Sequence, residues 1–225
     1  MSHEKIAAKF DEWAQSGRDE GMEKAHGDVV RQVVEKMGVA PGEKILDLGC
    51  GNGWATRLLA KTNAGVQAIG VDVAPQMIAR ADELHSFTIR ARYDLGRFEH
   101  LEFKDGEFAR VFSMEALYYA KDLNKALSEA FRVLKPGGSA DIIVDHYHEN
   151  EPSHGWGEEM GLDLHLLAED EWRVAFERAG FAPVTTTRVQ DSRGADAPDP
   201  ASECESGGVP KGTWAGSLWI HAKKP

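Results

Sequence analysis

The chain has 225 residues, 37 acidic against 26 basic side chains, and a formal net charge of -11. A hydrophobic fraction of 42% and a charged fraction of 28% are typical of a globular protein with one sizeable core, which excludes a disordered or fibrous chain. The negative charge repels phosphate backbones, so we expect no nucleic-acid partner.

Two helices are predicted ahead of the main fold. Apolar residues recur at helical spacing over residues 3–37, with a break at Ser16-Gly17 and an end at Gly38. We therefore divide the single predicted domain into N-terminal helices over residues 1–38 and a core over residues 39–225.

Strand-like and helix-like segments alternate through the core, joined by short turns that contain Gly, Asn or Pro. The predicted strands are 44–49, 66–73, 108–114, 139–147, 184–189 and 213–222. The predicted helices are 54–62, 74–84, 123–134 and 169–181. Residues 190–212 have almost no apolar content and are predicted to form a mobile loop. Because crossovers between parallel strands need helices, the pattern predicts an α/β, doubly wound sheet with a terminal antiparallel strand.

The compartment is inferred from what the chain lacks. No apolar run approaches the roughly 20 residues that cross a bilayer, and the first residues lack the layout of a signal peptide. Cys50 and Cys204 lie far apart and are expected to be reduced. We expect a cytoplasmic protein without membrane association, present as a monomer or homodimer.

Gly49, Gly51 and Gly53 alternate directly after the first strand, in the stretch ILDLGCGNG over residues 45–53. A ligand can approach a backbone closely where no Cβ intervenes, and glycine adopts positive φ at little cost. The next helix begins with unpaired N–H groups, which suit a carboxylate, a phosphate or sugar hydroxyls. Asp72 ends the following strand about twenty residues later, where a carboxylate can hydrogen-bond both hydroxyls of an adenosine ribose.

Two other interpretations of this turn remain open. The glycines could form only a tight turn, with Asp72 capping the helix that opens at Ala74-Pro75. A dinucleotide site is the second alternative, but it needs a third glycine near Thr56, which the chain does not have. The order of strand, glycines, helix and distant acid favours an adenosyl ligand.

At this point the chain resembles the class I S-adenosylmethionine-dependent methyltransferases. ILDLGCGNG resembles their first motif and VDVAPQMIARA the second, while FARVFSMEALYY and RVLKPGG resemble later ones, over about residues 40 to 145. The resemblance implies a Rossmann-like sheet of seven strands whose last strand is antiparallel. It also implies S-adenosylmethionine as cofactor and S-adenosylhomocysteine as product.

The same resemblance implies a set of donor-binding residues. The methionine part would be bound by Asp47, Gly49, Gly51, Gly53 and Ser113. The adenosyl part would be bound by Asp72, Val73, Met77, Arg97 and Phe98. Family members commonly place an acidic residue before a small or apolar one at the adenine edge, where this chain has Arg97 and Phe98. Phe98 can stack on the ring, but the acidic contact to the adenine amine is missing or comes from another residue.

The predicted catalytic residues lie at or beyond the ends of the predicted strands 108–114 and 139–147. Methyl transfer is an in-line displacement in which the protein chiefly aligns a nucleophile about 3 Å from the methyl carbon. Ligands of an open parallel sheet lie beyond the carboxyl ends of its strands. The titratable and aromatic groups there are Glu115, Tyr118, Tyr119, His146, Tyr147, His148 and His154.

His146 is the preferred general base, because an imidazole titrates near neutrality; a structural histidine at a strand end is the alternative. Tyr118 and Tyr119 would orient the acceptor or surround a cationic one, unless one of them is simply core. His146 and His148 could point the same way, yet no spacing matches a strong zinc signature, so no metal site is predicted.

Residues 1–38 are a predicted lid. Trp13, Met22 and His26 resemble in position the mobile helices that cover small acceptors in this family, and a lid would exclude water from the reaction. A helix packed permanently on the sheet is the alternative.

The sequence is therefore interpreted as an enzyme, a methyltransferase that moves a methyl group from S-adenosylmethionine to an O, N, S or C atom of a small-molecule acceptor. A non-catalytic S-adenosylmethionine-binding sensor or partner protein is the alternative. A nucleotide-dependent oxidoreductase is disfavoured by the missing third glycine.

Overall fold

A computed structural model describes residues 2–193 and 214–225, whose centre is a seven-stranded sheet in the order β3-β2-β1-β4-β5-β7-β6. The five strands β1 to β5 run parallel, and β7 lies antiparallel between β5 and β6. The strands are β1 (Lys44–Leu48), β2 (Gln67–Asp72), β3 (Ala91–Leu95), β4 (Phe108–Met114), β5 (Leu134–Val144), β6 (Val184–Val189) and β7 (Ser217–Lys223). The predicted fold class is confirmed.

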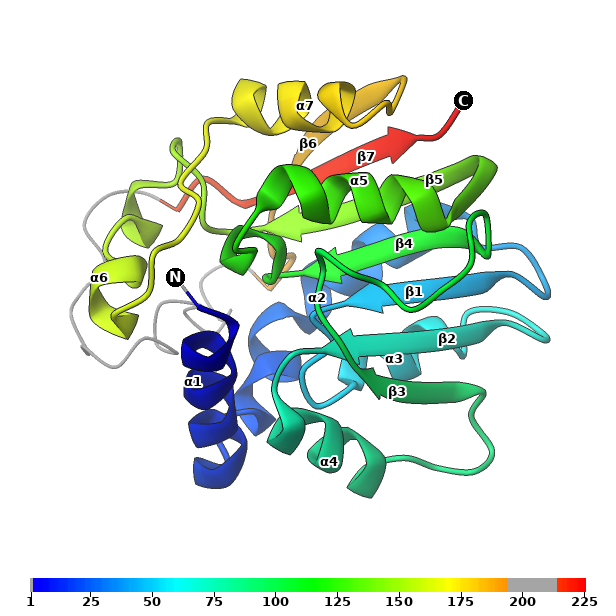
Figure 1. Cartoon of the computed structure of the whole chain (residues 1–225), viewed down its shortest axis with the longest axis horizontal. Coiled ribbons are helices and arrows are strands. Elements are labelled where there is room, and N and C mark those ends of the chain that lie inside the picture. The colour runs from blue at the N-terminus through cyan, green and yellow to red at the C-terminus, as the bar shows by residue number, and fades with distance from the viewer. Residues whose placement is uncertain (1, 194–213) are drawn as a thin grey trace.

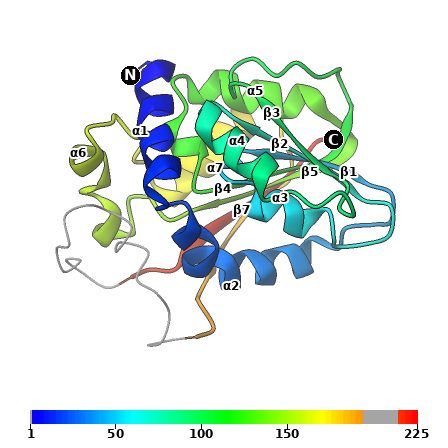
Figure 2. The same ribbon diagram turned by 90° about the horizontal axis from the view of Figure 1, so that it is seen from below.

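Helices cover both faces of this sheet. Two of them, α5 and α7, pack on one face, while α2 and α3 pack on the other (Figures 1 and 2). The α-helices are α1 (His3–Ser16), α2 (Glu20–Met37), α3 (Trp54–Leu59), α4 (Pro75–Glu83), α5 (Leu123–Val133), α6 (Trp156–Met160) and α7 (Glu169–Arg178). Two 3-10 turns, η1 (Leu117–Tyr119) and η2 (Glu151–Ser153), follow β4 and β5.

Local sequence explains where the first helices begin and end. The Ser2 hydroxyl accepts a hydrogen bond from the Lys5 N–H at 3.3 Å, which caps α1, and Gly17 ends that helix in the left-handed conformation. Gly38 ends α2 in the same way. Both N-terminal helices therefore have the predicted bounds, to within a few residues.

The central strands are buried on both faces, as expected of a parallel sheet between helix layers. In β1, Leu46 and Leu48 belong to the apolar cluster of α5 and α7, whereas Ile45 belongs to the cluster of α2 and α3. The order of strands reverses between β1 and β4, so the carboxyl ends of these two strands flank the crevice where such sheets bind ligands. Both α1 and α6 stand at that end of the sheet (Figure 1).

Strands β3 and β5 differ from the elements that the sequence predicts. Strand β3 was not predicted, because its sequence ARYDL mixes charged and apolar residues at an edge of the sheet. Strand β5 begins at Leu134 and takes in the Pro-Gly-Gly stretch that was expected to form a separate turn. The predicted mobile loop 190–212 lies outside the described residues from residue 194 onward, as does Cys204.

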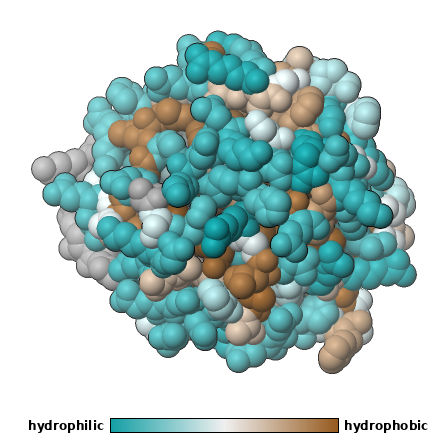
Figure 3. All heavy atoms as spheres, viewed as in Figure 1, coloured by the Kyte–Doolittle hydropathy of each residue, from teal (hydrophilic) through white to brown (hydrophobic). Residues whose placement is uncertain are grey.

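The surface agrees with the large charged fraction of the chain. The face seen in Figure 1 is mostly hydrophilic, with apolar atoms in small separate patches (Figure 3). Cys50 is buried as a free thiol. In the described part of the chain, no helix is long and apolar enough to cross a membrane.

Candidate active site

The glycine turn after β1 is held tightly against the neighbouring strands. The Gly49 and Cys50 N–H groups both donate to the Val71 carbonyl, at 2.8 and 3.1 Å. Gly49 has a φ of +75°, and a Cβ added there would lie 2.2 Å from the Ala116 Cβ. Gly51 also has positive φ, at +52°. The turn therefore exposes backbone, rather than side chains, at the carboxyl end of the sheet.

Asp72 faces this turn from the end of β2. One carboxylate oxygen accepts from the Gly51 N–H at 2.9 Å, and the other accepts from the Ala74 N–H at 2.9 Å. Burial raises the pKa of Asp72, while these N–H groups act in the opposite direction. Each oxygen keeps a second lone pair, so the carboxylate can still accept hydrogen bonds from a ligand.

A first pocket opens between the glycine turn and the loop after β3; we call it the donor pocket. Six of the ten predicted donor-binding residues line it: Gly49, Gly51, Asp72, Val73, Arg97 and Phe98. Its other lining residues are His3, Ile6, Phe10, Met22, Gly96, Glu99, Met114, Glu115, Ala116, Tyr119, Ala120 and Lys121. None of this second group is predicted from the sequence to bind the donor.

Glu99 brings a carboxylate to the donor pocket two residues after Arg97. It accepts hydrogen bonds from the His3 side chain at 2.9 Å and from the Asp122 N–H at 3.1 Å. Burial raises its pKa, but these hydrogen bonds outweigh burial and leave the pKa below its ordinary value. A carboxylate therefore lies in the donor pocket one residue after Phe98, whereas the family resemblance implies an acidic residue before Phe98.

Three predicted donor-binding residues do not line either pocket. Met77 is fully buried in the apolar core. The Ser113 hydroxyl is turned toward β1, where it donates to the Leu48 carbonyl at 2.7 Å. Gly53 begins α3, and a Cβ there would lie 2.4 Å from the Tyr93 ring. The side chains of Met77 and Ser113 face the protein interior in this structure, and a donor-binding role for the three residues stays a prediction.

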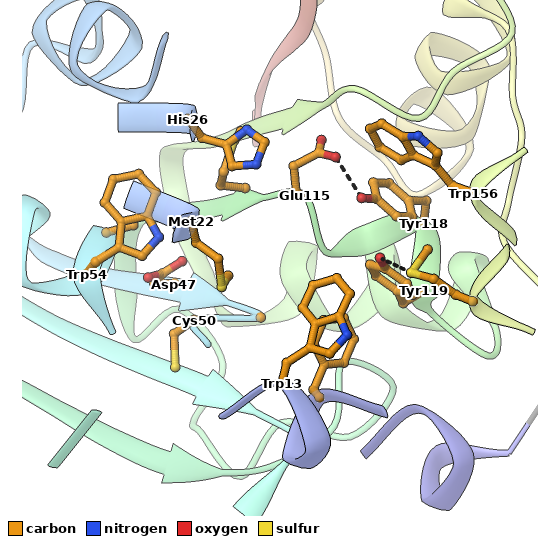
Figure 4. Close-up of a pocket in the computed structure, with 15 residues that line it drawn as sticks. Trp13, Met22, His26, Asp47, Cys50, Trp54, Glu115, Tyr118, Tyr119 and Trp156 are labelled. Carbon is orange, nitrogen blue, oxygen red and sulfur yellow. Dashed lines mark hydrogen bonds between the residues drawn. The ribbon is translucent and has the colours of Figure 1, made fainter. Parts of the chain in front are cut away.

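A second pocket adjoins the first; we call it the aromatic pocket. It shares Phe10, Met22, Gly49, Met114, Glu115 and Tyr119 with the donor pocket. Its other lining residues are Trp13, His26, Asp47, Cys50, Trp54, Ala55, Tyr118, Trp156 and Met160. Figure 4 shows the indoles of Trp13, Trp54 and Trp156 around this space. Helices α1, α3 and α6 supply these three indoles, and α2 adds Met22 and His26.

Asp47, the tenth predicted donor-binding residue, lines the aromatic pocket from the end of β1. Its carboxylate accepts a hydrogen bond from the Thr56 hydroxyl at 2.6 Å. Burial raises the pKa of Asp47 to about 7, and this hydrogen bond opposes the rise only in part. A cationic group of a ligand would favour the ionised form and so would be bound there.

Glu115 lies where the two pockets meet. Its backbone has a φ of +51°, which is rare for a residue other than glycine and common at functional sites. One carboxylate oxygen accepts from the Tyr118 hydroxyl at 2.7 Å, and the other accepts from the Asp145 N–H. Burial, followed by repulsion from the Asp145 carboxylate, raises the pKa of Glu115 well above its ordinary value.

Two of the three predicted catalytic residues line the aromatic pocket, and the third does not. Tyr118 and Tyr119 line the aromatic pocket, and the Tyr119 hydroxyl contacts the Met160 sulfur at 3.5 Å (Figure 4). His146 does not line it: the side chain is 2% exposed, and its Nδ1 is 2.9 Å from the Ser153 carbonyl. Burial lowers the pKa of His146 to about 4. The geometry thus does not favour His146 as the general base.

The remaining candidates after β5 lie away from the pocket. The buried Tyr147 hydroxyl donates to the Gly216 carbonyl at 2.8 Å, and His148 and His154 are exposed. Within residues 2–193 and 214–225, no three or more His, Cys, Asp and Glu side chains are grouped as a metal site would require.

His26 joins the aromatic pocket from α2, on the opposite side of the sheet from α5. Its Nδ1 lies 3.5 Å from a carboxylate oxygen of Asp145, which is 1% exposed. From the sequence, His26 is predicted only as part of a lid, and Asp145 has no predicted role. Their pairing joins residues 119 positions apart in the chain, so no local pattern could have indicated it.

Residues 45–138 match a known family described as a methyltransferase domain. Over 157 residues the chain is 34% identical to a sterol 24-C-methyltransferase of Yarrowia lipolytica, which covers 65% of this chain and 41% of that protein. It is 39% identical over 136 residues to 2-methyl-6-phytyl-1,4-hydroquinone methyltransferase of Synechocystis, covering 59% of this chain and 41% of that protein. The chain thus spans less than half the length of these two relatives.

A solved structure at 32% identity resembles nearly the whole chain. It comes from the complex between the Haloferax volcanii Trm112 methyltransferase activator and a methyltransferase. The matching chain has a TM-score of 0.84 and 32% identity, and the match covers 96% of this chain and 97% of that one.

Proposed function

Because the chain belongs to the class I S-adenosylmethionine-dependent methyltransferases, we propose that it transfers a methyl group from that donor to an O, N, S or C atom of a small acceptor in the aromatic pocket. The contact between the two pockets at Glu115 and Gly49 carries this proposal. A donor in one pocket and an acceptor in the other would meet there, as in-line displacement requires.

The residues of the donor pocket fit the donor. The glycine turn leaves room that a Cβ at Gly49 would fill, and Asp72 offers lone pairs to ribose hydroxyls. Phe98 can stack on the adenine, and Glu99 offers a carboxylate to its amine. When bound, S-adenosylmethionine supplies an electrophilic methyl group on a sulfonium, and Asp47 would lie near its amino group.

The N-terminal helices act as a lid in this proposal. The two pockets have volumes of about 60 Å³ each, whereas sites for ligands of this size measure roughly 300 Å³ or more. Met22 of α2 lies over the turn, since its methyl carbon is 3.2 Å from the position of a Cβ at Gly51. Donor entry therefore requires α1 and α2 to move away and then to close over the ligands.

The lining of the aromatic pocket favours a neutral or cationic acceptor over an anionic one. Among the described residues that line it, Glu115 is the acid that would face the acceptor, Asp47 would lie near the amino group of the donor, and none is Lys or Arg. Tryptophan and tyrosine faces bind apolar groups and attract cations. An acceptor that carries a phosphate or carboxylate would find no partner of opposite charge there.

A methyl-transfer screen tests the proposed function. The full chain, S-adenosylmethionine and a panel of small metabolites are incubated, and mass spectrometry is used to detect an acceptor that gains one methyl group. We expect at least one acceptor to raise S-adenosylhomocysteine release about tenfold or more above the rate without acceptor. Tight S-adenosylhomocysteine binding with no methylated product from any acceptor would contradict this proposal and favour the sensor.

A second proposal concerns a protein partner. The Haloferax volcanii neighbour is found with an activator protein, and we propose that this chain binds such an activator through the sheet edge at β3. An exposed edge strand can pair with another chain. Of the four exposed large apolar side chains in the described residues, three lie on or just before β3: Leu84, Phe87 and Leu95.

Co-purification tests this partner. The chain is expressed with Haloferax volcanii Trm112, and we expect the two to elute as one complex. Leu95→Asp places a charge on the edge strand and should weaken the complex at least about tenfold, the loss expected when a central apolar contact is removed. Leu166→Asp, at an exposed apolar residue outside this edge, is the matched control. Equal retention of both variants would exclude the β3 edge.

A further inference from the structure

His26 and Asp145 form a buried pair at the wall of the aromatic pocket. His26 is 7% exposed and Asp145 is 1% exposed, and 3.5 Å separates the His26 Nδ1 from the nearer carboxylate oxygen. His26 comes from α2, while Asp145 directly follows β5. Figure 4 shows the imidazole and the Glu115 carboxylate on the same wall of the pocket.

The buried Asp145 carboxylate depends on this histidine for stabilisation. Both of its carboxylate oxygens are buried, and neither has a hydrogen bond within normal distance from the described residues. A buried carboxylate without a partner is costly, and the imidazole is positioned to reduce that cost by directing an Nδ1–H toward it. This tautomer leaves the lone pair on Nε2, which is the nitrogen that can accept a proton.

The charges around His26 favour the imidazole as a proton acceptor. Asp145 faces the imidazole from the end of β5 and Glu115 faces it from the end of β4. An imidazolium formed beside the Asp145 carboxylate would be stabilised by its negative charge. His146, by contrast, is enclosed by Tyr118 and Trp156 and holds the Ser153 carbonyl with its Nδ1.

We propose that His26 is the general base of the methyl transfer, that Asp145 is its positioning residue, and that the acceptor atom carries a proton, as in a hydroxyl or ammonium group. This inference rests on the proposed function and narrows its acceptor class. The acceptor atom forms a bond to the methyl carbon while the bond between this carbon and the donor sulfur breaks. The electron pair of the broken bond stays on the sulfur. The proton of a hydroxyl acceptor passes to His26 Nε2 as the new bond forms, whereas an ammonium acceptor must first lose its proton to Nε2, because its nitrogen has no lone pair until then. His26 later releases the proton to solvent.

The position of the base on α2 links chemistry to lid closure. His26 reaches Asp145 only when α2 packs against the sheet in the arrangement seen here. The base is therefore complete only when the pocket is covered, so water is excluded before the proton is taken.

Two probes of similar shape test the base in the full chain. Phenol must lose a proton when it is methylated, whereas the thioether methyl phenyl sulfide has no proton to lose. With phenol, His26→Gln should lower kcat about 100-fold or more at pH 7, and the loss should shrink as the pH rises toward the pKa of phenol. Methyl phenyl sulfide should react at the wild-type rate. His148→Gln, at an exposed histidine, is the matched control.

A measurement without turnover tests the same pair. Nitrogen-15 NMR of the S-adenosylhomocysteine complex reports which imidazole nitrogen of His26 carries the proton. We expect the Nδ1–H tautomer in the wild type and a shift away from it in Asp145→Asn, as when the carboxylate beside a catalytic histidine is replaced by an amide. An Nε2–H tautomer in the wild type, or equal loss with both probes in His26→Gln, would overturn the proposal. If the wild type methylates nothing, the proposed function fails, and the NMR result still decides the pairing.

Discussion

Asp72→Ala is expected to weaken S-adenosylhomocysteine binding about 100-fold or more, because hydrogen bonds to a charged group contribute roughly 1.5 to 3 kcal/mol each. The variant removes the carboxylate that would hold the ribose. It also leaves the Gly51 and Ala74 N–H groups, now held at 2.9 Å, without an acceptor at the turn. Isothermal titration calorimetry measures the dissociation constant.

The control for this variant is Asp82→Ala, which removes an exposed carboxylate from α4. It should bind S-adenosylhomocysteine as the wild type does. If Asp72→Ala folds normally and keeps wild-type affinity, then Asp72 does not bind the donor, and the donor pocket has been assigned to the wrong ligand.

Gly49→Ala is expected to abolish donor binding and to destabilise the fold. The new Cβ would lie 2.2 Å from the Ala116 Cβ, and both groups belong to backbone segments held by the sheet. Neither can retreat without moving the glycine turn or the loop after β4. The left-handed φ of +75° adds a cost of about 1 kcal/mol. Thermal unfolding and calorimetric titration measure the two effects separately.

Gly137→Ala separates the clash from the backbone cost. Gly137 has a φ of +78°, and a Cβ there would meet nothing within 4 Å. We expect a small loss of stability and unchanged donor affinity. If the two variants lose the same stability and both bind the donor, close packing at Gly49 has no role in the site.

Motif residues beside strand ends could be placed from sequence, because their neighbours in space are set by the sheet. Gly49 and Gly51 follow β1, and Asp72 ends the adjacent strand, so parallel pairing brings them together. The register of β1 and β2 needs only the apolar runs that bury both strands. Residues farther from a strand end were predicted less well.

His146 shows why. It lies two residues beyond the end of β5, where the chain turns into η2, and a carbonyl of that turn holds its Nδ1. A residue one position earlier, Asp145, instead faces His26. Side-chain direction after a strand depends on the loop that follows, and nothing in the sequence of that loop specified its path.

By itself the sequence determined the alternation of strands and helices, the glycine turn and the acid on the next strand. These features follow from the periodicity of apolar residues and from backbone conformations that only glycine adopts easily. Only the tertiary structure decided the pairing of His26 with Asp145, the aromatic wall from three separate helices, and the carboxylate of Glu99 in the donor pocket. Such contacts join distant parts of the chain, and they exist only once helix packing has fixed where each side chain points.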